Sequence, residues 1–341
     1  TVLKLAGLKI PDHVQGRPFL GRDLGHLRKY VFGARDRMDE RYDIIRMVRG
    51  KRYKYIRNYE PLKTFYQYMN TPEKGATMRE LRRLHDEGKL SPEAERLFSS
   101  RKPVEELYDC QADPHELNNL AGDKEHHCHL IGMRAKHLKW VRDTGDLGLV
   151  PEGIITERTR QLGNSYAILR QEGAKETNRL LANMAAKASS GHKAFADLIA
   201  GLSAPDAAVR YWAATGVGNV AAGKSRAVSG TLKIKAREAA KRGLDDKSAS
   251  VRIALARALC HLEHPEKALP VLINELKTGN QWERLQAAIV LDEIDEQARP
   301  VLEQMRVGLE FQEGFNARGK YRVRVMNRAL NQLEGTNRKV Q

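Results

Sequence analysis

The segment Tyr42–Asn58 constrains the fold more than any other stretch of the chain. Two runs rich in aliphatic, β-branched and aromatic residues, Asp43–Arg49 and Arg52–Arg57, flank the pair Gly50-Lys51. Glycine at the first central position of a two-residue loop suits a type II′ turn, because that position needs a positive φ. We therefore predict an antiparallel hairpin with its turn at Gly50-Lys51.

The hairpin is also strongly basic, in a chain that is basic throughout. Six of the twelve residues from position 46 to 57 are Lys or Arg, which predicts positive charge on one face or edge; an ordinary solvated strand face is the alternative. The formal net charge is +16, and both halves of the 341 residues share it. This balance favours anionic partners such as sulfated sugars, nucleic acid or lipid headgroups without choosing among them.

The residues around the hairpin predict a small α+β unit of about 140 residues. Short strands are expected at Tyr30–Ala34 and Leu107–Asp109, and the charged loop Arg35–Arg41 leads into the hairpin. Apolar residues at helical spacing predict a covering helix over Leu130–Arg142. The segment Val2–Leu8 predicts a short helix, and the absence of a leader pattern suggests a larger domain upstream.

From Pro151 onward the strands give way to Ala-rich helical periodicity, with helices expected at Ile154–Glu172 and Lys175–Ser189. Four later segments then align with one another, at residues 205–220, 247–262, 279–294 and 319–333. Each carries an arginine in the same register: Arg210, Arg252, Arg284 and Arg324. Their separations of 42, 32 and 40 residues lie in the range of helical solenoids.

These segments resemble HEAT repeats, whose second helix commonly begins with a Val-Arg pair, although Glu283 stands where Val is expected in the third. The resemblance implies a concave, basic surface that could receive a protein partner. The register arginines are interpreted as structural, each pairing with a neighbouring Asp, rather than as ligand-binding. Trp212 and Trp282 are interpreted as packing residues rather than stacking platforms.

Three ordered motifs in the first half carry a second resemblance. They are LKLAGLKIPDHVQGRPFL, YVFGARDRMDERYDIIRMVRGKRYKYIRNYEP and VEELYDCQADPHELNNLAGD. Together they closely resemble the C-terminal subdomain of the sulfatase family, particularly its heparan N-sulfatase and N-sulfoglucosamine sulfohydrolase-like branch. The resemblance covers residues 1 to about 145 and implies a periplasmic or secreted protein, although the residues themselves leave the compartment open.

The resemblance also implies parts that this segment does not carry. The family's larger catalytic domain holds a formylglycine, made from Cys or Ser in a C/S-x-P-S/A-R motif, and a calcium ion. Cys110, Cys128 and Cys260 stand in other contexts, so none fits the modified nucleophile. We therefore expect no cofactor in this segment, with calcium and formylglycine in a catalytic domain that would be its partner.

The segment could still supply one wall of the substrate pocket. Arg35, Asp36 and Arg37 follow a predicted strand, where a loop would project, and arginine can bind a sulfate with two parallel hydrogen bonds. We predict these three as candidate substrate-binding residues, against the alternative of an internally paired surface cluster. His126, His127 and His129 beside Cys128 have poor spacing for one metal site, and we expect none there.

Two functions remain open on this reading. The favoured one is that residues 1–150 are the C-terminal portion of a sulfatase that acts on a sulfated glycan or sulfate ester. A HEAT-like solenoid follows over residues 151–341. The alternative is a non-catalytic, basic repeat protein that binds a polyanion or a protein partner. No apolar run approaches 18 residues, so no membrane span is predicted.

Overall fold

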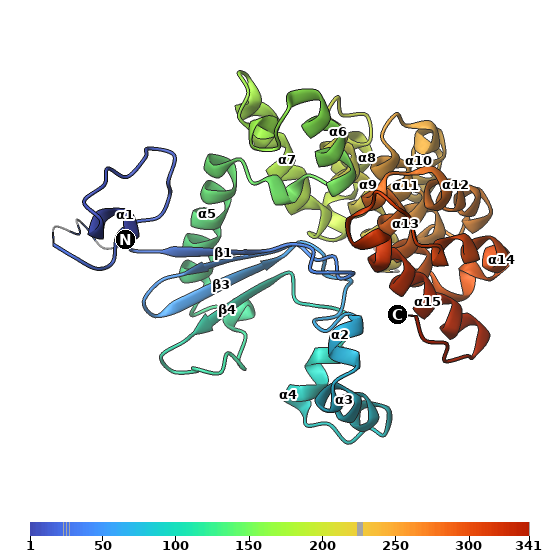
Figure 1. Ribbon diagram of the computed structural model, residues 1–341, viewed down its shortest axis with the longest axis horizontal. Helices are drawn as coiled ribbons and strands as arrows, with labels where there is room; N and C mark the ends of the chain where they lie inside the picture. Colours follow the sequence, from blue (N-terminus) through green and yellow to red (C-terminus); the bar gives the residue numbers. More distant parts are fainter. Residues whose placement is uncertain (23, 25, 27, 224–227, 341) are drawn as a thin grey trace.

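The computed structural model describes residues 1–22, 24, 26, 28–223 and 228–340. The first half contains a four-stranded antiparallel sheet in the order β1-β2-β3-β4 (Figure 1). Its strands are β1 (Val31–Arg35), β2 (Ile45–Arg49), β3 (Tyr53–Asn58) and β4 (Glu105–Asp109). All four lie where short strands were predicted, within two residues at each end.

The hairpin β2–β3 is confirmed, but its predicted turn type is wrong. Gly50 donates its backbone N–H to the carbonyl oxygen of Tyr53 at 2.9 Å, so Lys51 and Arg52 are the two central residues. Gly50 does not adopt a positive φ, and neither do the two central residues. Gly50 is therefore the first residue of the turn, whereas a type II′ turn would need glycine at the second position.

The sheet packs one face against the helix α5 (His127–Thr144), which crosses behind the strands in Figure 1. Alternating residues of the central strands point to this face, as the pleat requires. A small core forms there from Val48, Tyr55, Leu107, Leu130 and Met133. Phe32 of β1 stacks on Trp140 of α5, with ring centroids 5.0 Å apart.

The connection between β3 and β4 forms a separate projection below the sheet (Figure 1). It contains α2 (Asn70–Glu73), α3 (Ala76–Asp86) and α4 (Pro92–Glu95). At the other end of the sheet, α1 (Val2–Leu5) lies beyond the start of β1. No helix in the described residues is long and apolar enough to cross a membrane.

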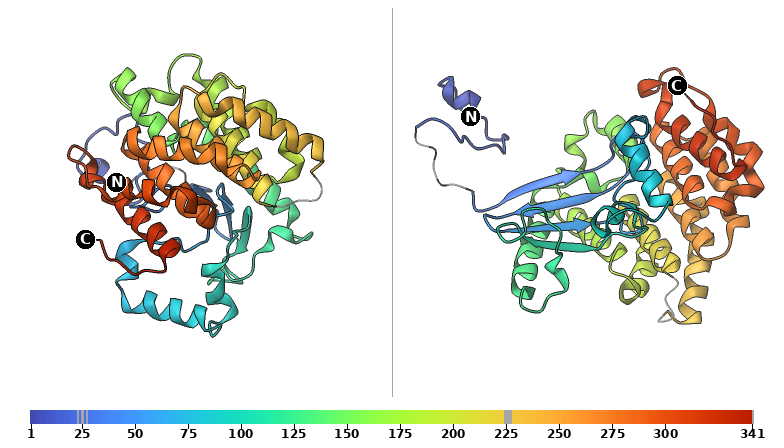
Figure 2. Two further views of the ribbon diagram at one scale, coloured as in Figure 1. Left: turned by 90° about the vertical axis from the view of Figure 1, so that its right-hand side faces the viewer. Right: turned by 90° about the horizontal axis from the view of Figure 1, so that it is seen from below.

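The second half is helical, as predicted. Its longer helices are α6 (Glu152–Leu162), α7 (Ala174–Ala188), α8 (Phe195–Gly201), α9 (Ala207–Ala222), α10 (Gly230–Arg242), α11 (Ala249–His261), α12 (Pro265–Thr278), α13 (Gln281–Glu293) and α15 (Lys320–Glu334), with the short α14 (Leu302–Met305). The expected continuous helix Ile154–Glu172 is broken, because Gly163 adopts a φ of 77° and ends α6. Helices α9, α11, α13 and α15 then pack in succession (Figure 2).

The register arginines make structural contacts. Arg210 binds Asp246, which lies just ahead of the next aligned segment, at 2.6 Å, as the sequence suggested. Arg252 pairs with Glu275 at 2.8 Å. Arg324 instead reaches Glu40, 3.3 Å away in the loop after β1.

The larger apolar core extends from the helices into the sheet half. Trp212 of α9 is fully buried and donates its indole N–H to the carbonyl oxygen of Leu149 at 2.7 Å. Its ring lies 5.9 Å from that of Tyr59, and Ile44 belongs to the same cluster. Trp212 is thus a packing residue, and this core continues across the predicted boundary at residue 150.

Candidate functional site

Arg35, Asp36 and Arg37 lie at the end of β1, where the chain turns toward the helical half. Although they are consecutive, their side chains make different contacts. Asp36 and Arg37 line one groove, and Arg35 is absent from its lining. The structure therefore separates the three residues that the sequence grouped together.

Arg37 is held by residues of the second half. Its Nε lies 2.8 Å from both carboxylate oxygens of Glu152, and its Nη1 donates to the carbonyl oxygen of Asp39 at 2.8 Å. The guanidinium carbon sits 4.2 Å from the ring centroid of Trp282 and 5.3 Å from that of Tyr321. Most of the binding capacity of Arg37 is therefore already used inside the protein.

Asp36 is neutralised by a buried arginine. Asp36 forms an ion pair with Arg46 at 2.8 Å, and Arg46 forms a second ion pair with Asp146 at 2.6 Å. Burial raises the pKa of Asp36, while the charge of Arg46 opposes that shift. A carboxylate in this position would repel a sulfate, so Asp36 suits a sugar hydroxyl or a structural role better.

Arg35 differs from its two neighbours. Its side chain is half-buried, and its guanidinium makes no hydrogen bond or ion pair with the described residues. In the strand pairing Arg35 lies beside Ile45, on the sheet face turned away from α5. Of the three residues, Arg35 is the one whose guanidinium could bind a ligand or another domain.

The groove beside this loop has a volume of about 210 Å³. Its polar lining consists of Asp36, Arg37 and Glu152, with Tyr42 at one side. Burial raises the pKa of Glu152, and Arg37 opposes that shift. Two carboxylates and one paired arginine leave no positive charge in excess, so the groove does not suit a sulfate group.

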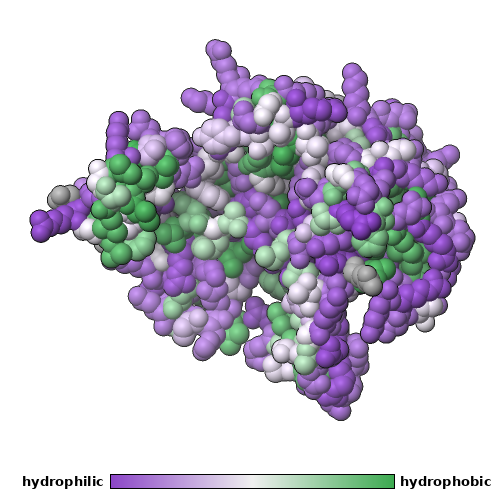
Figure 3. Space-filling view, in the orientation of Figure 1, coloured by the Kyte–Doolittle hydropathy of each residue, from purple (hydrophilic) through white to green (hydrophobic). Residues whose placement is uncertain are grey.

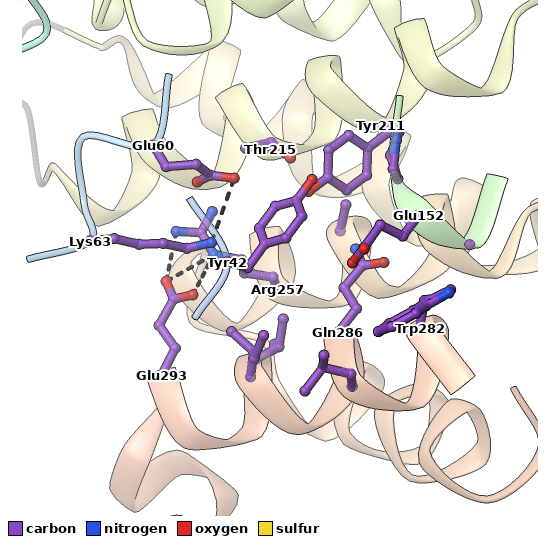
Figure 4. Close-up of a pocket in the computed structure, with 16 residues that line it drawn as sticks. Tyr42, Glu60, Lys63, Glu152, Tyr211, Thr215, Arg257, Trp282, Gln286 and Glu293 are labelled. Atoms are coloured by element: carbon purple, nitrogen blue, oxygen red, sulfur yellow. Dashed lines mark hydrogen bonds and ion pairs between the residues drawn. The ribbon is translucent and has the colours of Figure 1, made fainter. Parts of the chain in front are cut away.

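A smaller pocket adjoins this groove and shares Tyr42 and Glu152 with it (Figure 4). The hydroxyls of Tyr42 and Tyr211 meet near its centre. Arg257 binds Glu293 at 2.6 Å. With a volume of about 50 Å³, the pocket is too small for a saccharide, so we interpret it as part of the junction between the halves.

Sequence reasoning missed this junction. Two charged residues face it: Arg257 of α11 is buried, and its partner Glu293 of α13 is partly exposed. Arg257 lowers the pKa of Glu293 against the opposing effect of burial. Arg257 stands among Ala and Leu in the sequence, and this could have marked it as a residue with a buried partner. The sequence could not show that the partner is Glu293, 36 residues away.

The junction also covers one side of helices α9, α11 and α13. Side chains of α9, α11 and α13 face Tyr42, Glu60 and Lys63 from the sheet half (Figure 4). Trp282, on the same side, packs against Arg37 rather than standing open. Part of the surface predicted to receive a partner is therefore in contact with the chain itself.

The basic residues of the hairpin divide into three groups. Arg46 and Arg57 are buried, and Arg57 donates to the hydroxyl of Ser189 at 2.5 Å, so an exposed strand face was the wrong prediction for these two. Arg49 and Lys54 both pair with Glu116, at 3.7 Å and 2.5 Å. Lys51 and Arg52 are exposed at the turn. The charge that reaches solvent is thus concentrated at one end of the sheet.

The histidine cluster makes local contacts. His126 lies 3.0 Å from Asp123, and His129 stacks on Tyr53 with centroids 4.2 Å apart. No group of three or more His, Cys, Asp or Glu side chains in the described residues could hold a metal ion.

No family model matches this chain. Two curated proteins from Formosa agariphila, each named ulvan-active sulfatase, do match it. One is 43% identical over 168 residues, which is 49% of this chain; the other is 29% identical over 155 residues, or 43% of this chain. The matched region is 28% of the length of each relative. Over about half of its length, then, the chain is related to sulfatases.

Proposed function

We propose that this chain is the non-catalytic part of a sulfatase that removes sulfate from a sulfated glycan. The observation that carries the proposal is the 43% identity to an ulvan-active sulfatase over about half of the chain. The sheet backed by α5 agrees with the C-terminal subdomain that the motifs imply. The sequence has no C/S-x-P-S/A-R motif, so the nucleophile would come from a catalytic domain.

We propose that the catalytic domain docks on the sheet face opposite α5. Ile45, Met47 and Ile56 are only half-buried there, and Val31 is 48% exposed. Hydrophobic atoms follow the strands on this side of the molecule (Figure 3). An apolar face of this kind is usually covered by another part of the protein. The occupant we propose is the domain that makes up much of the relatives' remaining length.

This docking would direct Arg35 toward the substrate cleft. Arg35 lies on the same face as the exposed apolar residues, at the end of β1, and its guanidinium is not used within the described chain. A guanidinium can bind a sulfate group through two parallel hydrogen bonds. Arg35 is therefore the member of the predicted set that we retain as a pocket-wall residue. We give Arg37 and Asp36 the role of holding its loop.

The HEAT-like half would act as an internal support. Arg37 is clamped between Glu152, Trp282 and Tyr321, and Glu40 is bound by Arg324. These contacts fix both ends of the loop that follows Arg35. They favour support of the sheet over the alternative of a free basic repeat surface that binds a polyanion or a protein partner.

The experiment requires the chain joined to its catalytic domain, assayed for sulfate release. Ulvan is the first substrate to test because both relatives are named for it. An N-sulfated glucosamine tests for activity of the heparan N-sulfatase-like branch. Arg35→Gln should raise KM about tenfold or more, since a charge-assisted bidentate contact contributes roughly 1.5–3 kcal/mol. The matched control is Arg49→Gln, which removes a charge from the same sheet face beside Glu116.

Two results would contradict the proposal. Turnover of an aryl sulfate by residues 1–341 alone, dependent on a side chain of this segment, would show that a nucleophile had been overlooked. Equal effects of Arg35→Gln and Arg49→Gln on KM would show that Arg35 does not contact the substrate.

A further inference from the structure

A second cavity, far from the junction, lies at the turn end of the hairpin. It is enclosed by the β2–β3 turn, the residues just before β1 and the first turns of α5, and its volume is about 470 Å³. It is lined by Lys29, Tyr30, Gly50, Lys51, Arg52, Tyr53, Cys128, His129, Gly132 and Met133. We call it the hairpin-end pocket. The β2–β3 turn that lines it lies at the end of the sheet away from the helical half (Figure 1).

The charge of the hairpin-end pocket is positive. Lys29 and Lys51 are exposed, and neither forms an ion pair with a carboxylate of the described chain. Arg52 pairs with Asp109 at 2.6 Å, and this hydrogen bond lowers the pKa of Asp109 to about 2. The lining contains no Asp or Glu, and neither does the first turn of α5. Two lysine charges are therefore left for an anionic ligand.

Aromatic rings form part of the same lining. Tyr30 is half-buried, with the ammonium group of Lys29 5.7 Å from its ring centroid. Tyr53 is fixed by His129, which stacks on it at 4.2 Å. Sugar rings present apolar C–H faces as well as hydroxyls, so rings and cations side by side suit a charged saccharide. A bare anion would use only the lysines.

The two cavities of the sheet half differ in charge. The groove beside Asp36 and Glu152 has acidic groups and a fully paired arginine. The hairpin-end pocket has two lysines without carboxylate partners. Since β1 spans Val31–Arg35, the pocket lies roughly 17 Å from Arg35 along the strand. It would be a subsite separate from the proposed pocket wall.

We propose that the hairpin-end pocket binds a sulfated sugar unit of a polysaccharide. Lys29 and Lys51 contact the sulfate, and Tyr30 packs against the sugar ring. This inference rests on the proposed function, because it assigns a second contact to the same class of substrate. It requires neither the catalytic domain nor turnover, so it can be tested on residues 1–341.

The first experiment measures binding of a dextran sulfate oligosaccharide by titration calorimetry, with unsulfated dextran of equal length as its control. The double variant Lys29→Gln/Lys51→Gln should weaken binding about tenfold, since each lysine contact contributes up to about 1 kcal/mol. The matched control, Lys193→Gln/Lys235→Gln, removes two exposed lysines from the helical half. Tyr30→Leu should reduce affinity for dextran sulfate more than affinity for polyglutamate, which has charge but no sugar ring.

The second experiment locates the ligand. Cys128 lines the pocket and is exposed, whereas Cys260 is buried in α11. Dextran sulfate should slow alkylation of Cys128 by iodoacetamide, and the effect should disappear in Lys29→Gln/Lys51→Gln. Unslowed alkylation in a saturated complex would overturn the assignment.

The remaining outcomes also decide the matter. Equal weakening by the two lysine pairs would show attraction to overall charge, and equal binding of unsulfated dextran would exclude a sulfate contact. Either result overturns this pocket and leaves the proposed sulfatase role untouched. Failure of sulfate release by the assembled enzyme, with Cys128 still protected, would instead count against the proposed function alone.

Discussion

The stability of this protein should fall in mild acid because of one buried histidine. His137 lies on α5 with 1% of its surface exposed. Its Nε2 is 2.9 Å from the hydroxyl of Tyr59, and its Nδ1 has no hydrogen-bond partner in the described structure. Burial, reinforced by the positive charge of Arg57, lowers the pKa of His137 to about 3. The folded protein therefore keeps this ring neutral at ordinary pH.

The sign and size follow from proton linkage. In the unfolded chain His137 takes up a proton near its ordinary pKa of about 6.5, whereas in the folded protein it does not. The unfolded state binds more protons below that pH, so the free energy of unfolding decreases as the pH falls. For these two pKa values, the loss between about pH 7.5 and about pH 5 is about 2 kcal/mol from this residue alone.

The assay is urea unfolding followed by tryptophan fluorescence at both pH values. His137→Gln keeps a polar partner for Tyr59 but cannot titrate, so its free energy of unfolding should vary less with pH than that of the parent. His192→Gln, which replaces an exposed histidine, serves as the control. If His137→Gln loses as much stability in acid as the parent does, the buried neutral histidine is not the cause.

Three further substitutions test the contacts around the loop that follows β1. Arg37→Ala should lower the free energy of unfolding by about 1–3 kcal/mol by leaving Glu152 unpaired, and Arg37→Lys should restore only part of it; urea midpoints measure both. Arg46→Met should cost about 3–5 kcal/mol, because Asp146 becomes an uncompensated buried charge, and full stability in this variant would contradict the ion-pair geometry. Gly148→Ala should cost about 1–3 kcal/mol, since an added Cβ would overlap the guanidinium of Arg46; an unchanged melting temperature would show that the guanidinium moves aside freely.

The sequence predicted the elements whose signals are local. The strands around Val48 and Tyr55 and the helix with Leu130 and Met133 follow from periodicity, which depends only on near neighbours. The break after α6 was missed, although Gly163 was visible, because an isolated glycine does not reveal whether it will adopt a positive φ.

The site was less predictable because its contacts join distant parts of the chain. Arg37 was predicted as a substrate-binding residue, but the sequence could not show that its guanidinium is bound by Glu152, 115 positions away. Composition alone treated Arg46 and Lys51 alike as basic hairpin residues. Only the register of the folded sheet shows that Arg46 is buried whereas Lys51 is exposed at the turn.

The ion pair between Glu40 and Arg324 has a consequence for how the protein is made. Its two residues are 284 positions apart, and Glu40 is buried in the finished structure. On a ribosome, the loop that carries Glu40 is complete long before α15 is synthesised. That carboxylate therefore lacks its arginine partner until α15 has been synthesised, although Asn70 already donates its backbone N–H to it, so the sheet half should acquire its final stability only after α15 has packed.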